Sequence, residues 1–383
     1  MATTFLILFL FLLFIGYAIL IDFYRRKWKA IPMFLAEDKD PVTKVAVIIP
    51  FRNEAVHLPA LLHCLQTQEY PKHLCEYIFI DDHSTDPSVS IIHSFNLSFP
   101  YQVLSLNELE PHLEAGAHKK RAINAGIKAS QADLIITTDA DCTMSSRWIY
   151  RLVAHYENMD TAFIAAPVKI ISKKKSFVAL FQTMDFLTLQ GITGAAVYSG
   201  FHSLCNGANL AYSKKLFEEI KGFEGIEGTP SGDDVLLMQK IRSIRPDTIS
   251  YCKHPEAIVS TAAVNSWSDF FSQRIRWASK AKFYTEKNLQ TVMGGVYVLN
   301  CCLLLLVFKA LFSETAASML LIFFLAKILI EFPFLNAVMK FFHQQRLAVW
   351  FVLMQPFHIL YTIIAGGFGL IGNYTWKERK HSN

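Results

Sequence analysis

Residues 133–142 read DLIITTDADC, an apolar run that ends in two aspartates on either side of an alanine. A short apolar run rich in β-branched residues is typical of a strand buried on both faces of a mostly parallel sheet. Two carboxylates so close together cost free energy unless a cation neutralises them. Asp139 and Asp141 are therefore candidate ligands of one divalent cation, Mg²⁺ or Mn²⁺, which takes its other ligands from water and substrate phosphate oxygens.

Three further apolar runs have the same character. They cover residues 44–50, 76–80 and 162–168, and longer helical patterns separate them. This alternation predicts that residues 41–260 form a globular α/β domain around a Rossmann-like sheet that is mixed but mostly parallel.

Polar side chains follow the ends of these strands, where open α/β sheets bind their ligands. A single acid at such a place is usually a helix cap or a turn residue. Four strand ends or loops carry acids here, so the pattern predicts a binding site at this edge of the sheet. Besides Asp139 and Asp141, the residues concerned are Pro50, Arg52, Asn53 and Glu54, then Asp81, Asp82 and Ser84, and finally Asp233 and Asp234.

Three basic residues, Lys119, Lys120 and Arg121, stand at the expected start of a helix. A lysine at a helix entrance suits a diphosphate, because its ammonium and the free backbone N–H groups point the same way. The alternative is a solvated basic face of the helix.

Composition separates the soluble part of the chain from its ends. The 383 residues carry a formal net charge of +5 without a long basic stripe, so nucleic acid is not an expected partner. The seven cysteines are scattered and lack C-x-x-C spacing, which indicates reduced thiols in a cytoplasmic setting. Hydrophobic residues make up 52% of the chain and are in excess mainly at its two ends. Membrane segments are therefore expected on both sides of a soluble domain.

Residues 1–30 are expected to form an N-terminal membrane anchor. An apolar run of spanning length is followed by the basic cluster Arg25, Arg26, Lys27 and Lys29. A signal peptide has the opposite order, with its positive charge before the apolar core. We therefore expect a retained anchor in the inner or plasma membrane, with the following domain in the cytoplasm.

Residues 291–373 are expected to contain about three membrane spans, in runs at residues 294–312, 316–338 and 347–371. Three spans would put the basic tail outside, against the positive-inside tendency. In the alternative, one run is re-entrant or lies in the interface.

Two ionisable residues, Lys327 and Glu331, lie within the second of these runs. Ionisable residues inside a membrane indicate function by default. At a spacing of four residues they can instead neutralise one another on one helix face.

Residues 261–290 are predicted to form an interfacial amphipathic helix, in which Ser266 and Asp269 fit a capping box. An interfacial role alone does not explain the cluster Gln273, Arg274, Arg276 and Trp277. Upstream, residues 176–201 are apolar enough either to lie against a membrane or to form an ordinary core helix.

Taken together, these motifs resemble family 2 glycosyltransferases, the inverting type with a GT-A nucleotide-sugar domain. More narrowly they are similar to the membrane-embedded branch with cellulose, chitin and hyaluronan synthases and ceramide glucosyltransferases. The chain has Asp233 where many members have Glu, and Lys-Arg where small residues usually follow the lysine. The matching residues are Pro50 to Glu54 for P-x-x-N-E, Asp81, Asp82 and Ser84 for D-D-x-S, Asp139 and Asp141 for D-x-D, Asp233 and Asp234 for E/D-D, and Gln273, Arg276 and Trp277 for Q-x-x-R-W. In addition, Lys119 matches the family's lysine five residues before the Asn of an L/I-N pair, here Asn124.

The resemblance implies a role for each of these residues. Pro50, Glu54 and either Asp81 or Asp82 would contact the nucleoside, and Lys119 the diphosphate. Asp139 and Asp141 would hold the metal, Asp139 also serving the nucleotide sugar. Asp234, beside Asp233, would be the general base, and Gln273, Arg276 and Trp277 would close the site.

The implied function is metal-dependent sugar transfer with inversion, from a nucleotide-diphosphate sugar to a lipid or lipid-linked saccharide at the membrane. Membrane lipids are then further partners of this multi-pass protein. The alternatives are a processive polysaccharide synthase, a nucleotidyltransferase and a non-catalytic nucleotide-sugar-binding membrane protein.

Overall fold

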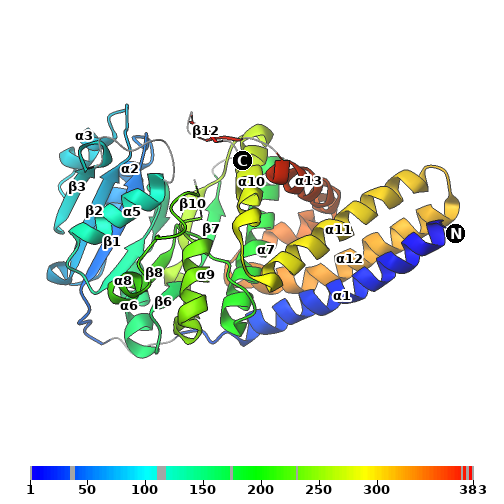
Figure 1. Cartoon of the computed structure of the whole chain (residues 1–383), viewed down its shortest axis with the longest axis horizontal. Coiled ribbons are helices and arrows are strands. Elements are labelled where there is room, and N and C mark those ends of the chain that lie inside the picture. The colour runs from blue at the N-terminus through cyan, green and yellow to red at the C-terminus, as the bar shows by residue number, and fades with distance from the viewer. Residues whose placement is uncertain are drawn as a thin grey trace. The chain divides into compact units, whose positions relative to one another are not determined.

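The computed structural model describes residues 2–34, 39–109, 118–172, 176–229, 232–371, 374–376 and 379–381. The chain divides into two compact units (Figure 1). The globular unit comprises Ile31–Ile171 and Ser203–Ala262, and the helical unit comprises Met1–Ala30, Ser172–His202 and Ala263–Asn383.

A seven-stranded sheet forms the centre of the globular unit, in the order β3-β2-β1-β4-β8-β6-β9. The first four strands are parallel, β8 runs antiparallel to β4 and β6, and β9 is parallel to β6. This arrangement confirms the predicted mixed, mostly parallel sheet. The strands are β1 (Val45–Phe51), β2 (Cys75–Asp81), β3 (Tyr101–Ser105), β4 (Leu134–Thr137), β6 (Phe163–Ala165), β8 (Leu210–Ser213) and β9 (Ile249–Tyr251).

Short helices connect these strands. They are α2 (Leu58–Gln66), α3 (Ser88–Ser94), α4 (Leu106–Leu109), α5 (His118–Ala129), α6 (Trp148–Asn158), α8 (Lys214–Glu219) and α9 (Val235–Ile244), with 3₁₀ turns at Lys72–Leu74, Pro246–Thr248 and Pro255–Ala257. Helix α5 packs tightly on the sheet, since a Cβ at Gly126 would lie 2.9 Å from Ile48 Cγ2 and 3.0 Å from Ile80 Cδ1. The start of α5 is thereby held close to the ends of β1 and β2.

A second, three-stranded sheet has the order β5-β10-β7. Its strands are β5 (Cys142–Met144), β7 (Val168–Ile171) and β10 (Val259–Ala262). The prediction of one strand over residues 162–168 is therefore wrong, because the chain leaves the large sheet after β6 and enters the small one at β7. Pro167 lies at this switch, and proline has no N–H with which to continue a strand ladder.

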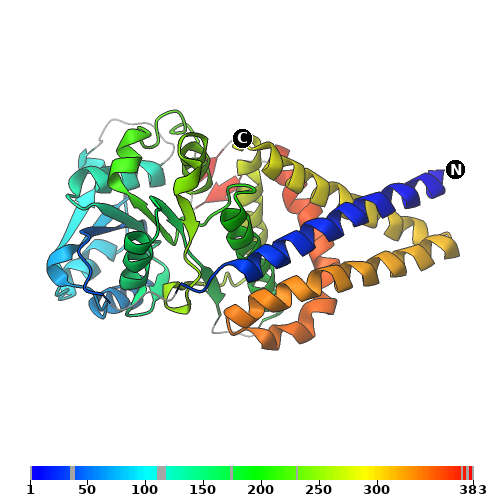
Figure 2. The same cartoon turned by 90° about the horizontal axis from the view of Figure 1, so that it is seen from below.

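The helical unit contains six helices of the described chain. They are α1 (Ala2–Ala30), α7 (Phe177–Ser199), α10 (Trp267–Ser279), α11 (Lys287–Ala310), α12 (Glu314–Phe341) and α13 (Phe351–Ile371), with 3₁₀ turns at Lys280–Phe283 and Gln345–Trp350 and a hairpin of β11 (Tyr374–Trp376) and β12 (Arg379–His381). Helices α1, α11 and α12 run side by side (Figures 1 and 2). Phe14 of α1 stacks on Phe323 of α12 with ring centroids 4.8 Å apart.

Four segments of the described chain are long and apolar enough to cross a membrane. They are Ile7–Ala30, Lys287–Ala310, Glu314–Phe341 and Gln345–Leu370. Helix α7 differs from them, since 16 of its 23 residues are buried inside the protein. Of the two interpretations of this segment, the structure agrees with the core helix.

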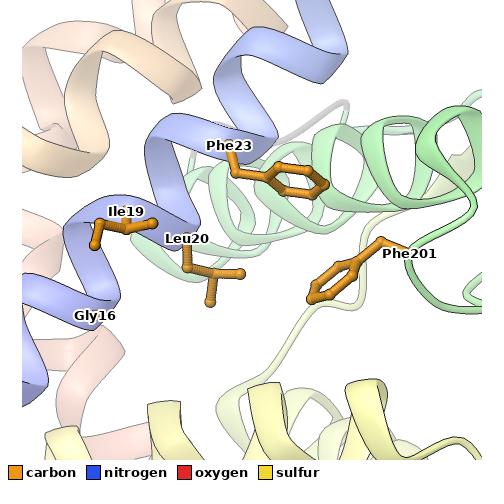
Figure 3. A pocket seen from close by; sticks show the side chains of 5 residues that line it. All are labelled: Gly16, Ile19, Leu20, Phe23 and Phe201. Carbon is orange, nitrogen blue, oxygen red and sulfur yellow. The ribbon is translucent and has the colours of Figure 1, made fainter.

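A hollow of about 300 Å³ borders α1 in the helical unit. Figure 3 shows Gly16, Ile19, Leu20 and Phe23 of α1 together with Phe201 around it. A Cβ at Gly16 would meet no atom within 4 Å, so the glycine leaves this side of the helix open. The lining is apolar throughout.

Candidate active site

The loops after β1 and β2 are tied together at the carboxyl edge of the sheet. Asn53 has a left-handed backbone with φ of 52°, a conformation that asparagine tolerates better than most residues. Its N–H donates to Ser84 Oγ at 3.0 Å, and its side-chain oxygen accepts from the Thr85 N–H at 2.8 Å. Asn53 and Ser84 therefore hold the two loops in register.

The two neighbouring aspartates after β2 have different surroundings. Asp81 accepts a hydrogen bond from the Ser84 N–H at 3.0 Å, which makes it a turn residue. Asp82 is 7% exposed, and its Oδ1 lies 3.0 Å from His83 Nδ1 and 3.1 Å from His118 Nδ1. The structure thus distinguishes two acids that the sequence left equivalent.

His83 and His118 were missed by the sequence reasoning, although each adjoins a predicted site residue. Burial lowers the pKa of His118, outweighing the opposite effect of Asp82. The ligand atoms of Asp82, His83 and His118 all lie within 4.8 Å of one another and could share a metal ion. Imidazole nitrogens suit zinc and iron better than Mg²⁺.

Lys119, in the first turn of α5, lies among the predicted acids. Its Nζ is 2.6 Å from Asp139 Oδ1 and 3.3 Å from Asp233 Oδ2. Burial by itself lowers the pKa of Lys119, but Asp139, Asp233 and Asp234 together raise it well above its usual range. Lys119 therefore stays charged at neutral pH and offsets part of the negative charge.

Asp141 has a separate support from the small sheet. Its Oδ2 accepts a hydrogen bond from Thr261 Oγ1 of β10 at 3.0 Å. Asp139 follows β4 and has a side chain that is 37% exposed. The two carboxylates of the D-x-D are thus held by different partners, Lys119 for one and Thr261 for the other.

Asp234 lies at the start of α9 and has two hydrogen bonds from backbone groups. Its Oδ1 accepts from the Val235 N–H at 2.8 Å, so it also caps the helix. Its Oδ2 accepts from the Gly207 N–H at 3.3 Å. Asp234 therefore caps a helix, as a lone acid at such a place usually does. It also belongs to the cluster with Asp233 and Lys119.

Gly207 is a further residue of this cluster that sequence reasoning missed. A Cβ there would lie 2.8 Å from Asp233 Oδ2 and 3.2 Å from Lys119 Nζ. Thr137 Oγ1 of β4 donates to the Gly207 carbonyl at 3.2 Å, which fixes the loop against the sheet. The Asn-Gly pair at residues 206–207 was the available signal, because such pairs are typical of tight turns.

The donor set at this edge fits a hard divalent cation. Asp139, Asp141, Asp233 and Asp234 offer carboxylate oxygens, the ligands that Mg²⁺ and Mn²⁺ prefer. Lys119 already compensates three of these acids electrostatically. These acids could hold a divalent cation beside Lys119, although among the described residues only Asp82, His83 and His118 bring three ligand atoms within 4.8 Å of one another.

The remaining predicted residues lie on α10 in the helical unit. Ser266 caps α10, accepting from the Asp269 N–H at 3.1 Å, which confirms the N-cap half of the predicted capping box. The Asp269 carboxylate accepts from the Ser266 hydroxyl at 2.6 Å. Gln273 Oε1 accepts from Gln182 Nε2 at 3.1 Å. Arg276 and Trp277 are half-buried.

The aromatic face of α10 is covered by protein. Phe270 is fully buried, with ring centroids 5.5 Å from Phe181 of α7 and 5.4 Å from Tyr361 of α13. Trp267 stacks on Phe357 of α13 with centroids 6.2 Å apart. Much of the aromatic surface that suggested a membrane interface therefore packs on other helices.

Lys327 and Glu331 neutralise one another within α12. Lys327 donates to Glu331 and, at 2.8 Å, to Gln355 Oε1 of α13. Gln355 Nε2 donates to Glu331 Oε2 at 2.8 Å, and Tyr17 of α1 donates to Glu331 as well. The mutual-neutralisation interpretation is confirmed, and the network joins three helices.

Known proteins resemble this chain in sequence and in fold. Residues 46–221 match the family model "Glycosyl transferase family 2". The "Probable glycosyltransferase YdaM" of Bacillus subtilis (strain 168) is 26% identical over 257 residues, which cover 66% of this chain and 59% of that protein. The "Undecaprenyl-phosphate 4-deoxy-4-formamido-L-arabinose transferase" of Pseudomonas fluorescens is 31% identical over 147 residues, 34% of this chain and 41% of that protein.

A solved structure extends the likeness of fold beyond the matched domain. It is the "Mannosyltransferase PcManGT from Pyrobaculum calidifontis in complex with GDP-Man and Mn2+", with a TM-score of 0.64, 18% identity and coverage of 95% of this chain and 98% of that one. The chain spans about three fifths or less of the two curated relatives, 59% and 41%. The family-model match over residues 46–221 and the fold agree: this part of the chain is similar to family 2 glycosyltransferases and has the mixed, mostly parallel α/β sheet typical of the GT-A type.

Proposed function

We propose that the protein transfers a sugar from a nucleotide-diphosphate sugar to a lipid or lipid-linked saccharide, with inversion at the anomeric carbon. The observation that carries the proposal is the grouping of Lys119, Asp139, Asp233 and Asp234 at the carboxyl edge of a domain similar to family 2 glycosyltransferases. A diphosphate needs positive charge there, and Lys119 at the start of α5 supplies it.

The acids divide into cation ligands and a base. Asp139 and Asp141, with Asp233 beside them, would hold Mg²⁺ or Mn²⁺, which when bound supplies charge stabilisation to the departing nucleoside diphosphate. Asp234 would take the proton of the acceptor hydroxyl while the hydroxyl oxygen bonds to the anomeric carbon of the sugar. The bond between that carbon and the diphosphate oxygen breaks on the opposite face. One displacement of this kind inverts the configuration.

The nucleoside would bind where the β1 and β2 loops meet. Pro50 and Glu54 flank Asn53, which ties these loops together. Asp82, buried and in contact with two histidines, is the better candidate of the aspartate pair to contact the base. The resemblance assigns the closing of the site to Gln273, Arg276 and Trp277.

The membrane part of the proposal rests on four helices. Residues 1–30 would anchor the chain, residues 261–290 would lie at the interface, and α11, α12 and α13 would span the bilayer within residues 291–373. The basic residues after the α1 span favour a cytoplasmic globular unit in an inner or plasma membrane. A reporter attached after residue 383 and a cysteine label in the globular unit would show on which side of the membrane each of them lies.

The acceptor would be a lipid. The hollow beside α1 is apolar and lies in the segment of spanning character, which suits a hydrocarbon chain (Figure 3). The Pseudomonas relative is named for transfer to undecaprenyl phosphate, a lipid of this kind. Single transfer is favoured over processive synthesis because the described part of the chain has four candidate spans, and a channel for a polymer normally needs more.

The test uses the full chain in lipid with Mn²⁺ or Mg²⁺, a panel of nucleotide sugars and membrane lipid extracts, with products identified by mass spectrometry. Asp234→Asn should lower kcat by about 100-fold or more, since general-base catalysis contributes 10²–10⁴. Asp139→Ala should weaken metal-dependent nucleotide binding. Asp160→Asn, an exposed acid of the same unit, is the matched control and should behave like wild type.

Other outcomes would contradict the proposal. Release of pyrophosphate in place of a nucleoside diphosphate would indicate a nucleotidyltransferase. Full function in Asp234→Asn would indicate a non-catalytic protein, and formation of long saccharide chains a processive synthase.

A further inference from the structure

Two consecutive residues of the Q-R-I-R-W segment are bound by residues one turn apart on α7. Gln182 donates from Nε2 to Gln273 Oε1 at 3.1 Å. Its Oε1 accepts from the Val264 N–H, just before α10, at 3.0 Å. Both polar ends of the Gln182 amide are thereby used to hold α10, and Gln182 itself is fully buried.

The second contact is a buried ion pair. Arg274 Nη2 lies 2.6 Å from Asp185 Oδ2, and the two side chains are only 3% and 4% exposed. Asp185 Oδ2 and the Arg274 nitrogens have no hydrogen-bond partner among the described residues, so the contact is an ion pair. Tyr361 of α13 donates to the other oxygen, Oδ1, at 2.5 Å. Asp185 therefore joins α7, α10 and α13.

Arg274, held by Asp185, also contacts Trp277 of the same segment. Its guanidinium carbon lies 4.3 Å from the centre of the Trp277 ring and 5.0 Å from that of Phe270. A guanidinium over an indole face is an attractive arrangement, strongest where water is excluded. Phe186, next to Asp185, also approaches Trp277, with ring centroids 6.0 Å apart.

We propose that Gln182 and Asp185 are positioning residues, which fix Gln273 and Trp277 of α10 in the geometry that sugar transfer requires. The inference rests on the proposed function, in which these two α10 residues close the site. Removing the Asp185 charge leaves Arg274 buried and uncompensated, so α10 must shift or open to rehydrate it. A small displacement of catalytic geometry is enough to slow a reaction strongly.

The same unit contains a matched control. Glu331 pairs with Lys327, which is 1% exposed, in a buried network of α12, α13 and α1 that includes no residue of α10. Glu331→Gln therefore breaks a buried ion pair of the helical unit, as Asp185→Asn does, without removing a direct contact of the Q-R-I-R-W segment. His358 of α13 interacts electrostatically with both ion pairs, so the two variants share that long-range effect.

The experiment compares Asp185→Asn with Glu331→Gln in the full protein in lipid nanodiscs. Asp185→Asn should lower kcat by about 10- to 100-fold, the usual effect of losing a partner that orients a functional group. The KM for the nucleotide sugar should change by less than about threefold, because ground-state binding is retained. Glu331→Gln should keep kcat within about twofold of wild type after correction for folded protein.

Hydrogen exchange supplies a readout that is independent of catalysis. Residues 267–279 should exchange faster in Asp185→Asn and at the wild-type rate in Glu331→Gln, which should instead loosen α12. Arg274→Lys keeps the charge but loses the planar contact with Trp277, and should lower kcat while retaining most of the protection of α10.

Several outcomes would overturn the inference. The inference is wrong if both variants, Asp185→Asn and Glu331→Gln, lose activity only in proportion to the loss of folded protein. It is also wrong if the hydrogen-exchange rate of α10 is the same in both variants. If Asp185→Asn does not fold, Gln182→Leu decides the question, since an unchanged kcat would then refute it. An inactive wild type would refute the proposed function alone, and hydrogen exchange would still test whether Asp185 holds α10.

Discussion

Replacing Gly207 by alanine should slow the reaction without unfolding the protein. The new methyl carbon would lie 2.8 Å from Asp233 Oδ2 and 3.2 Å from Lys119 Nζ. Ordinary contacts begin near 3.4 Å, so Asp233 must retreat by about 0.6 Å. Gly207 has no left-handed backbone, and alanine therefore adds no backbone strain.

The size of the effect follows from this displacement. Moving Asp233 Oδ2 from 3.3 Å to about 3.9 Å from Lys119 Nζ weakens their attraction by about 0.8 kcal/mol at an effective dielectric constant of 20. Overpacking in a tight site costs about 1–3 kcal/mol in all. If the transition state bears this cost, kcat falls by about 5- to 150-fold.

The assay is single-turnover sugar transfer with saturating nucleotide sugar, together with thermal unfolding. Gly294→Ala is the matched control, since a Cβ there meets no atom within 4 Å. A Gly207→Ala variant with kcat within twofold of wild type would refute the reasoning that this loop controls the carboxylate cluster.

Three further predictions concern other parts of the molecule. Burial lowers the pKa of His155, which bonds Ser250 Oγ, from 6.5 to about 4. As the pH falls through this range, only the unfolded state gains a proton at this residue. Stability should drop by about 2 kcal/mol from pH 7 to pH 5, and unfolding curves of His155→Gln should lack this loss; an equal slope in the variant would contradict the assignment. Gly16→Phe should fill the apolar hollow and raise the KM for a lipid acceptor several-fold with the nucleotide-sugar KM unchanged, whereas equal changes in both would count against a lipid site. Gly191→Ala should lower stability by about 1–3 kcal/mol in thermal unfolding, because its methyl would lie 2.4 Å from Val338 Cγ2, and an unchanged melting temperature would show that the α7–α12 contact adapts.

The apolar runs predicted the strands correctly where one run corresponds to one strand. The runs at 44–50, 76–80 and 133–138 correspond to β1, β2 and β4, since strands buried on both faces show a continuous apolar run. The run at 162–168 failed, because one apolar pattern fits strands of two different sheets equally well and only Pro167 marked the switch.

The site shows a similar division. Position after a strand was enough to select Asp139 and Asp141 as candidates, and the acidic pair in a later loop selected Asp233. Their roles stay predictions. It was not enough to find His118 or Gly207, whose relevance depends on neighbours that are distant along the chain.

The local order of apolar and charged residues was sufficient to predict the α/β class, the acids at the strand ends and the helices able to cross a membrane. Three-dimensional packing was needed to show that Lys119 lies between Asp139 and Asp233, and that α7 is a core helix whose Asp185 pairs with Arg274. These are pairings between segments distant in the chain. They depend on how buried charges find partners during packing, which local patterns do not encode.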